Sequence, residues 1–262
     1  MSGYKQRCAL ITGASDGLGK EFALQYAKKG YKVVLVSRNV EKLKSVASEI
    51  THEGGSAEII TTDLTSPYAA ESIFQQLNDK ELQIHTLVNN AGLGDHGDFI
   101  SCDLKKQEAI IEVNVNSLTK LTRLALNHMN NLNSGLILNV ASTAAFQPGP
   151  FMSVFFASKA YVLSFSEALK NELNGSGIKV CCLCPGPIDT PFLKNSKMEE
   201  SSGIKTIKPM SAKAVVKEAF KGIKKNKTVI IPGFFNKLIS IAYRLLPRNL
   251  VTSLSRHIVE DI

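Results

Sequence analysis

A glycine-rich turn at residues 12–19, with the sequence TGASDGLG, leaves few folds open to this chain. It lies between a predicted apolar strand and a predicted amphipathic helix. In this setting Gly13 allows a tight turn off the strand, Gly17 lets the backbone approach a pyrophosphate, and Gly19 lets the helix pack close to the sheet. The N–H groups at the start of the helix then face an anion. The turn therefore predicts a dinucleotide-binding α/β unit.

The remaining sequence continues this alternation of strands and helices. Strands are predicted at residues 8–12, 32–37, 57–62, 84–89, 135–141, 179–184 and 228–231. Helices are predicted at 20–29, 41–53, 67–78, 104–132 (one long helix or two joined ones), 151–174 and 212–225. The strands are continuous apolar runs, which are typical of a parallel sheet covered on both faces. We expect an α/β fold with a single Rossmann-type doubly wound parallel sheet of about seven strands, order 3-2-1-4-5-6-7.

The chain is expected to form one catalytic domain over residues 1–232, which includes an irregular substrate loop at 187–210. Residues 233–262 form an amphipathic helical extension that we expect to pack on the same domain. Apolar residues at helical spacing make two stripes, separated by Pro247: Leu238, Ile241, Ala242 and Leu245, then Leu250, Val251, Leu254 and Ile258. The basic residues Lys237, Arg244, Arg248 and Arg256 are interleaved with them. Such a segment can make peripheral contact with an anionic membrane, cap a substrate cleft or join subunits.

Composition adds broad limits. The 262 residues are 44% hydrophobic and 21% charged, as expected for a globular protein. The 31 Lys and Arg and 23 Asp and Glu give a net charge of +8, which suits an anionic ligand or a solvated basic surface. No aromatic–basic platform indicates binding to nucleic acid. The sequence contains no run of 18 apolar residues, so we expect no membrane-spanning helix. The first seven residues precede a predicted strand and leave no room for a signal peptide.

The five cysteines are odd in number and lack a CxxC spacing. Three of them, Cys181, Cys182 and Cys184, lie in a predicted strand, where thiols act as small apolar side chains. We therefore expect no metal site. Reduced thiols favour a cytoplasmic location.

Five separated motifs resemble the short-chain dehydrogenase/reductase family, over residues 5 to about 232. They are the TGxxxGxG turn, Asp63 after the third strand, Asn89-Asn90-Ala91-Gly92 after the fourth, the Ser142/Lys159 region, and Pro185-Gly186 with Thr190. The resemblance implies that the Asn89 segment buttresses the sheet and that Asp63 contacts adenine. It also implies that Thr190 holds the nicotinamide amide and Lys159 the ribose hydroxyls. Such families usually form dimers or tetramers, so we expect a homodimer or homotetramer.

The cofactor-binding residues that follow from these motifs are Gly13, Ser15, Asp16, Gly17, Leu18, Gly19, Ser37, Arg38, Asp63, Leu64, Asn90, Ala91, Gly92, Lys159, Pro185, Gly186, Ile188 and Thr190. An acidic residue at the end of the second strand would repel a 2′-phosphate, but Ser37 and Arg38 stand there. Arginine offers a planar fork of donors to a phosphate, so NADP(H) is the predicted cofactor. Asp16 argues weakly against NADP(H), because its negative charge would repel the 2′-phosphate.

The resemblance implies a catalytic set of Asn114, Ser142, position 155 and Lys159, with Asn114 holding a water that relays protons to Lys159. Reduction of a ketone needs a proton on its oxygen, which a tyrosine can donate when a nearby ammonium lowers its pKa. A lysine four residues later on a helix lies on the same face. The chain carries Phe155 at this position, which has no hydroxyl. Tyr161 lies about 200° around the helix from Lys159 and faces away.

Two explanations of Phe155 stay open. An engineered Tyr-to-Phe variant would leave Asn114, Ser142 and Lys159 in place, as found here, and is favoured. The alternative is a natural pseudoenzyme that binds NADP(H) as a sensor or scaffold. The implied activity is reduction of a ketone or aldehyde, or oxidation of a secondary alcohol, and is expected to be severely impaired in this chain.

The substrate is expected to be an apolar carbonyl or alcohol, bound beyond the carboxyl ends of the strands. Steroids, acyl thioesters, sugars and simple ketones all remain possible. A lid is predicted from Phe192, Leu193, Met198, Ile204 and Ile207, and an opposite wall from Phe146, Pro148, Phe151 and Met152.

Overall fold

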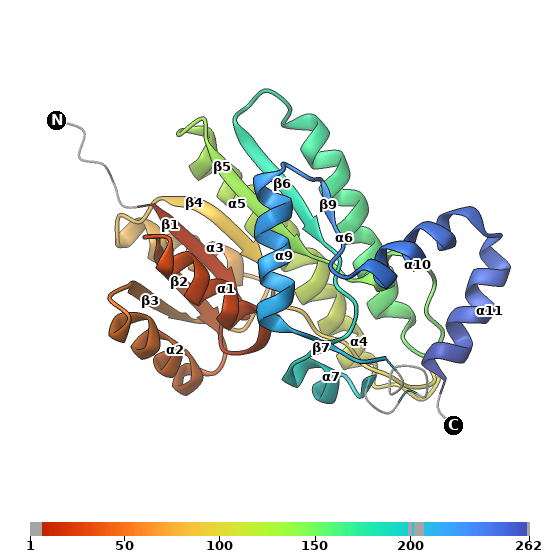
Figure 1. The fold of residues 1–262 in the computed structure, drawn as a ribbon. Helices are drawn as coiled ribbons and strands as arrows, with labels where there is room; N and C mark the ends of the chain where they lie inside the picture. The colour runs from red at the N-terminus through yellow and green to blue at the C-terminus, as the bar shows by residue number, and fades with distance from the viewer. Residues whose placement is uncertain (1–6, 199–200, 202–206, 261–262) are drawn as a thin grey trace.

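The computed structural model describes residues 7–198, 201 and 207–260. Its centre is a parallel sheet of seven strands in the order β3-β2-β1-β4-β5-β6-β9, which confirms the predicted doubly wound topology (Figure 1). The strands are β1 (Cys8–Thr12), β2 (Lys32–Ser37), β3 (Ser56–Thr61), β4 (Ile84–Asn89), β5 (Gly135–Val140), β6 (Ile178–Leu183) and β9 (Val229–Ile230). Every neighbouring pair runs parallel, so the carboxyl ends of all the strands meet at one edge.

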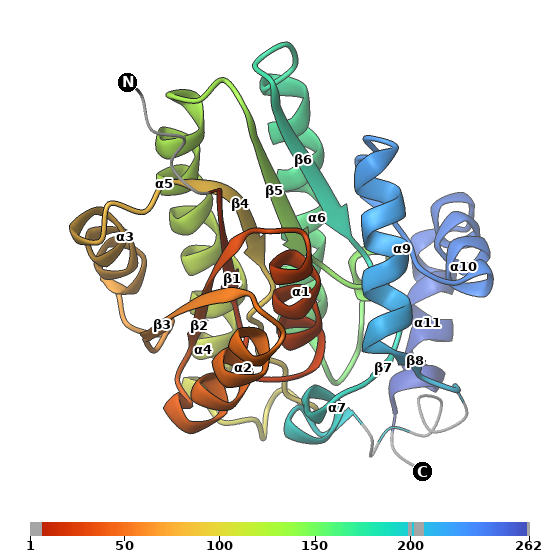
Figure 2. The same ribbon diagram turned by 60° about the vertical axis from the view of Figure 1, so that its left-hand side comes forward.

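Helices cover both faces of this sheet (Figure 2). One face packs against α1 (Gly17–Lys28), α2 (Val40–His52) and α9 (Ala212–Lys224), the other against α3 (Ala69–Asp79), α5 (Leu118–Asn130) and α6 (Ser153–Glu172). Within β1, Ile11 belongs to the first of these cores and Leu10 to the second, and both are fully buried. Burial on both faces explains why the strands are apolar throughout.

The predicted helix at 104–132 is two α-helices joined by a π-helix. The segment η1 (Glu112–Ser117) connects α4 (Leu104–Ile111) to α5. π-Helices are rare and occur frequently at functional sites. Asn114, a predicted catalytic residue, lies within η1.

The predicted irregular stretch after β6 is partly ordered. The short strand β7 (Ile188–Asp189) pairs with β8 (Met210–Ser211), and α7 (Pro191–Asn195) follows β7. Proline at the start of α7 has the fixed φ that a first helical turn requires. The prediction of an entirely irregular loop was therefore wrong at these segments.

The chain ends in two helices, α10 (Phe234–Leu245) and α11 (Arg248–Val259), which lie at one edge of the molecule in both views (Figures 1 and 2). The Arg244 guanidinium lies 5.4 Å from the centre of the Phe146 ring. At the end of α11, the Nε2 atom of His96 donates a 2.7 Å hydrogen bond to the carbonyl oxygen of Val259. Within the described residues, no helix combines the length and apolar character needed to cross a bilayer.

Candidate active site

A cavity of about 560 Å³ opens at the carboxyl ends of the strands. It extends from the glycine turn before α1, past the loop after β4, to the inner side of α10 and α11. Doubly wound α/β proteins bind ligands at this edge of the sheet. The cavity therefore has a dinucleotide-type end at the turn and a second end beside the C-terminal helices.

The glycine turn is held tightly against the loop after β4. The Asn90 side chain donates hydrogen bonds of 2.9 and 3.2 Å to the carbonyl oxygens of Thr12 and Gly13. Gly13 has a φ of 64°, which favours glycine. A Cβ atom on Gly19 would overlap the carbonyl oxygen of Gly13. Any side chain at Gly19 would therefore displace the turn, which agrees with its predicted packing role.

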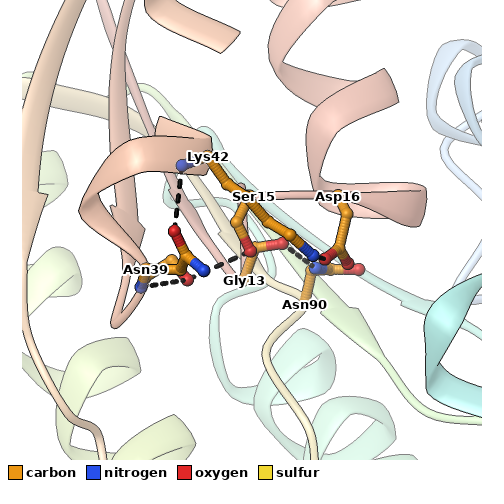
Figure 3. A network of polar contacts seen from close by, with 7 residues as sticks. Gly13, Ser15, Asp16, Asn39, Lys42 and Asn90 are labelled. Carbon is orange, nitrogen blue, oxygen red and sulfur yellow. Dashed lines mark hydrogen bonds and ion pairs between the residues drawn. The ribbon is translucent and has the colours of Figure 1, made fainter. Parts of the chain in front are cut away.

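Polar side chains surround the turn where the sequence predicts the adenosine phosphate (Figure 3). Lys42 Nζ lies 2.9 Å from the Asp16 carboxylate. Asn39 caps α2 by accepting a 2.9 Å hydrogen bond from the Lys42 backbone N–H. The positive charge of Lys42 therefore offsets the negative charge of Asp16, which in the sequence argued against a bound 2′-phosphate.

Asn39 and Lys42 line the cavity and were missed in the sequence. Their signal was available, because asparagine before an apolar helix is a typical N-cap and the third residue after the cap lies near the same helix end. Helix starts in this region face the cofactor edge of the sheet.

Arg38 contacts Asp63, its neighbour across the ends of β2 and β3. Arg38 Nη1 lies 3.8 Å from the Asp63 carboxylate, and both side chains are exposed. Partial burial raises the pKa of Asp63, but hydrogen bonds from Thr65 and the charge of Arg38 outweigh it, so the pKa is lowered. Asp63 thus stays ionised and orients the guanidinium at the mouth of the cavity.

In the loop after β4, Gly92 lies close to both Lys159 and Asn114. Lys159 is buried, and its Nζ donates a 3.1 Å hydrogen bond to the carbonyl oxygen of Val140. Asn114 exchanges two hydrogen bonds, of 2.8 and 2.9 Å, with the backbone of Leu93. A Cβ atom on Gly92 would lie 3.3 Å from Asn114 Oδ1 and 3.4 Å from Lys159 Nζ. Burial lowers the pKa of Lys159 to about 8.

Phe155 occupies the wall beside Lys159. Its ring centre lies 5.7 Å from Lys159 Nζ, and the residue is 3% exposed. The ring packs against Phe156 and Phe192, with centres 6.0 and 5.8 Å away. Tyr161 faces away as predicted, with its hydroxyl 2.9 Å from Thr119 Oγ1. The side chain one helical turn before Lys159 is therefore aromatic and has no hydroxyl proton to donate.

Ser142 follows β5 and lines the same part of the cavity. Its hydroxyl oxygen accepts a 3.1 Å hydrogen bond from the Ala144 N–H and lies 3.4 Å from the carbonyl oxygen of Pro185. These contacts fix the hydroxyl at the cavity wall. Ser142, Phe155 and Lys159 thus share one wall, and Asn114 stands behind it.

The structure brings the predicted cofactor residues together. All of them except Gly19 line the cavity: Gly13, Ser15, Asp16, Gly17, Leu18, Ser37, Arg38, Asp63, Leu64, Asn90, Ala91, Gly92, Lys159, Pro185, Gly186, Ile188 and Thr190. Gly17 and Thr190 are neighbours, because a Cβ atom on Gly17 would lie 3.0 Å from the Thr190 methyl carbon. No group of three or more His, Cys, Asp or Glu among the described residues could hold a metal ion.

One predicted wall of the substrate end is wrong. The lid residues Phe192, Leu193, Met198 and Ile207 line the cavity, whereas Ile204 lies outside the described residues. The opposite wall is formed by Ile239, Tyr243, Ile258 and Val259 and not by Phe146, Pro148, Phe151 and Met152. Phe146 and Phe151 instead pack under Arg244 and Arg256, with ring centres 5.4 and 5.1 Å from the guanidinium carbons. The C-terminal helices cover the position that the sequence assigned to these residues.

Residues 7–201 match the short chain dehydrogenase family, and the chain belongs to this family. It is 40% identical over 200 residues to mouse 17-beta-hydroxysteroid dehydrogenase type 3, covering 74% of this chain and 65% of that protein. It is 37% identical over 196 residues to the very-long-chain 3-oxoacyl-CoA reductase of Anas platyrhynchos, covering 72% of this chain and 62% of that protein. The chain thus spans less than two thirds of the length of these relatives.

A solved structure supports the same relationship. A short-chain dehydrogenase from Sphingobium yanoikuyae in complex with NADPH superposes with a TM-score of 0.81 at 29% identity, covering 91% of this chain and 94% of that one.

Proposed function

We propose that this protein binds NADP(H) and is built to interconvert a ketone or aldehyde and its alcohol. The observation that carries the proposal is the single cavity joining the glycine turn to Ser142 and Lys159. Gly13 and Gly17, which line the cavity with positive φ angles, fit the turn to a closely approaching pyrophosphate, and Gly19 lets the helix pack against the turn. A bound nicotinamide would supply or accept the hydride.

The chain's own residues would have separate parts. The Ser142 hydroxyl can donate a hydrogen bond to a carbonyl oxygen, and the Lys159 ammonium can stabilise negative charge that develops there. Asn114 would position Lys159 through the packing around Gly92. Phe155 stands where a proton donor is needed, so we propose that turnover is severely impaired. Loss of a positioned general acid typically slows a reaction by about 10²–10⁴-fold.

The preference for NADP(H) over NAD(H) is supported by Arg38 and Lys42 at the mouth of the cavity. Asp16, the nearby acid, lies within ion-pair distance of Lys42. The test is fluorescence titration of the purified protein with NADPH and NADH. Tighter binding of NADPH is expected, and equal affinities would overturn the assignment.

For the substrate, we propose a bulky, lipophilic carbonyl or alcohol. The lid and the C-terminal helices give that end of the cavity an apolar lining, including Phe192, Met198 and Ile239. The relatives named for a hydroxysteroid and a very-long-chain 3-oxoacyl-CoA act on ligands of this character. Extraction of the purified protein with organic solvent, followed by mass spectrometry, tests for a copurified lipophilic ligand.

Two further features belong to the proposal. A homodimer or homotetramer is proposed because members of the family commonly form such oligomers, and sedimentation analysis of the purified chain tests it. A cytoplasmic location is supported by the cysteines, none of which forms a disulfide within the described residues. A natural cofactor sensor is the second candidate, because the Phe155 ring is well packed between Phe156 and Phe192. Activity after restoring tyrosine at this position distinguishes it from a disabled enzyme.

A further inference from the structure

One side of α10 presents large apolar side chains to solvent. Phe234, Leu238, Ile241 and Leu245 are 70%, 49%, 58% and 80% exposed. Their spacing of three and four residues places them on a single stripe, the outer face of α10. On the opposite side, Ser240 is buried. The helix is therefore amphipathic with its apolar side outward, the reverse of a helix that only packs on a domain.

Basic residues accompany this outer face. Lys237 and Arg244 lie along one margin of it on α10, and Arg248 begins α11 close to its end. All three are exposed, although Arg244 also lies 4.0 Å from Glu167. Lysine and arginine can extend their stems along an apolar surface while the charge stays in a polar layer.

The C-terminal part of the chain carries an excess of positive charge. Residues 219–259 contain eight Lys and Arg and no Asp or Glu. The other residues hold 23 Lys and Arg and 23 Asp and Glu, so they are formally neutral. Four of these eight, Lys237, Arg244, Arg248 and Arg256, lie on the two C-terminal helices, and the other four lie at the end of α9 and in the turn before β9.

An apolar face with a basic border fits an anionic lipid surface. A second copy of the chain fits less well, because two such faces brought together would oppose like charges. We propose that the outer face of α10 docks the protein on an anionic membrane, with the helix lying in the interface and its apolar side chains inserted among the acyl chains. The anionic cytoplasmic leaflet has the required charge.

Docking in this orientation has a consequence for the cavity. Ile239 and Tyr243 of α10 line the cavity, and Ile258 of α11 lines it as well. The helix that meets the membrane is thus also a wall of the substrate end, so a lipophilic substrate could pass from the bilayer into the cavity. This consequence rests on the proposed function, whereas the docking itself does not.

The test is cosedimentation of the intact chain with phosphatidylcholine vesicles that contain or lack phosphatidylserine. Binding is expected to the anionic vesicles and to weaken with added salt. The Ile241→Glu/Leu245→Glu variant should bind at least about tenfold more weakly, because two apolar side chains no longer enter the bilayer. Lys237→Gln and Arg248→Gln should each weaken binding roughly fivefold.

Matched controls use equivalent changes elsewhere. Ile100 is 87% exposed outside the C-terminal helices, so Ile100→Glu should leave vesicle binding unchanged. Lys44→Gln on α2 removes the same charge and should also have little effect. Absence of binding by the unaltered chain, or equal binding by Ile241→Glu/Leu245→Glu, would overturn the proposal. A dimer that dissociates in that variant, with no vesicle binding, would assign the face to a second copy instead. NADPH binding, measured in parallel, separates this outcome from failure of the proposed function.

Discussion

The ammonium nitrogen of Lys159 lies 5.7 Å from the centre of the Phe155 ring, one turn earlier on the same helix. Both residues are buried, and the ring supplies no hydroxyl to share the ammonium proton. The ammonium instead donates a hydrogen bond to the carbonyl oxygen of Val140. A buried cation with little hydrogen bonding loses solvation, which is why the pKa of Lys159 falls to about 8.

This depressed pKa predicts how stability varies with pH. The folded-state pKa of Lys159, about 8, lies below the ordinary lysine value of 10.5. Below pH 8 Lys159 is charged in the folded and in the unfolded protein, so the folded protein bears the full cost of burying the charge. That cost is on the order of 3 kcal/mol for such a shift. Between pH 8 and 10.5 the folded protein releases its proton first, and the cost fades.

Lys159→Met removes the titrating group and should isolate this effect. The measured quantity is the free energy of unfolding of the variant minus that of the unaltered chain. This difference should be more positive at pH 7 than at pH 10, by about 3 kcal/mol. Urea unfolding of both proteins at the two pH values measures it. Other titrating groups are common to the two proteins and cancel. A stability difference that is the same at pH 7 and pH 10 would show that Lys159 is not perturbed.

The basic pair at the mouth of the cavity is predicted to select NADPH. Arg38→Ala/Lys42→Ala removes the two cations that line the cavity beside the turn. Charge-assisted hydrogen bonds contribute about 1.5–3 kcal/mol each, so NADPH affinity should fall at least about tenfold. NADH lacks the 2′-phosphate, and its affinity should change little. Lys44→Ala, on the same helix, is the control, and an equal loss for both cofactors would argue against a phosphate contact.

Close packing of the glycine turn predicts a sharp effect of a single methyl group. Gly19→Ala puts a Cβ atom onto the carbonyl oxygen of Gly13 and within 2.7 Å of the Asn90 side chain. The turn must shift, which should lower the free energy of unfolding by about 1–3 kcal/mol and weaken both cofactors. Thermal melting and cofactor titration measure these two effects. Lys20→Ala, one position later in α1, should leave both unchanged.

Much of the architecture could be predicted because the sequence patterns are local. Continuous apolar strands and the glycine turn define the sheet order and the cofactor edge, as Leu10 and Ile11 illustrate by entering opposite cores. The π-helix around Asn114 could not be predicted, because an α-helix with the same residues satisfies every local preference. Only the structure shows that residues Glu112–Ser117, between α4 and α5, form a π-helix.

The substrate wall shows a second limit. Phe146 and Phe151 are close in sequence to Ser142 and were assigned to the cavity, yet the cavity wall comes from Ile239 and Tyr243. That wall depends on contacts between segments about 100 residues apart, which no periodicity encodes. Lys42 was missed for a simpler reason, since a lysine near a helix start is usually a solvated side chain.

The most direct measurement is hydride transfer by Phe155→Tyr, followed as NADPH oxidation with a panel of bulky ketones. The new hydroxyl would lie beside the Lys159 ammonium, so turnover should rise about 10²–10⁴-fold over the unaltered chain. Phe156→Tyr places a hydroxyl on the adjacent residue and should give no such gain. Unchanged turnover in Phe155→Tyr, while the protein still binds NADPH, would contradict a disabled reductase and leave a cofactor-binding protein in its place.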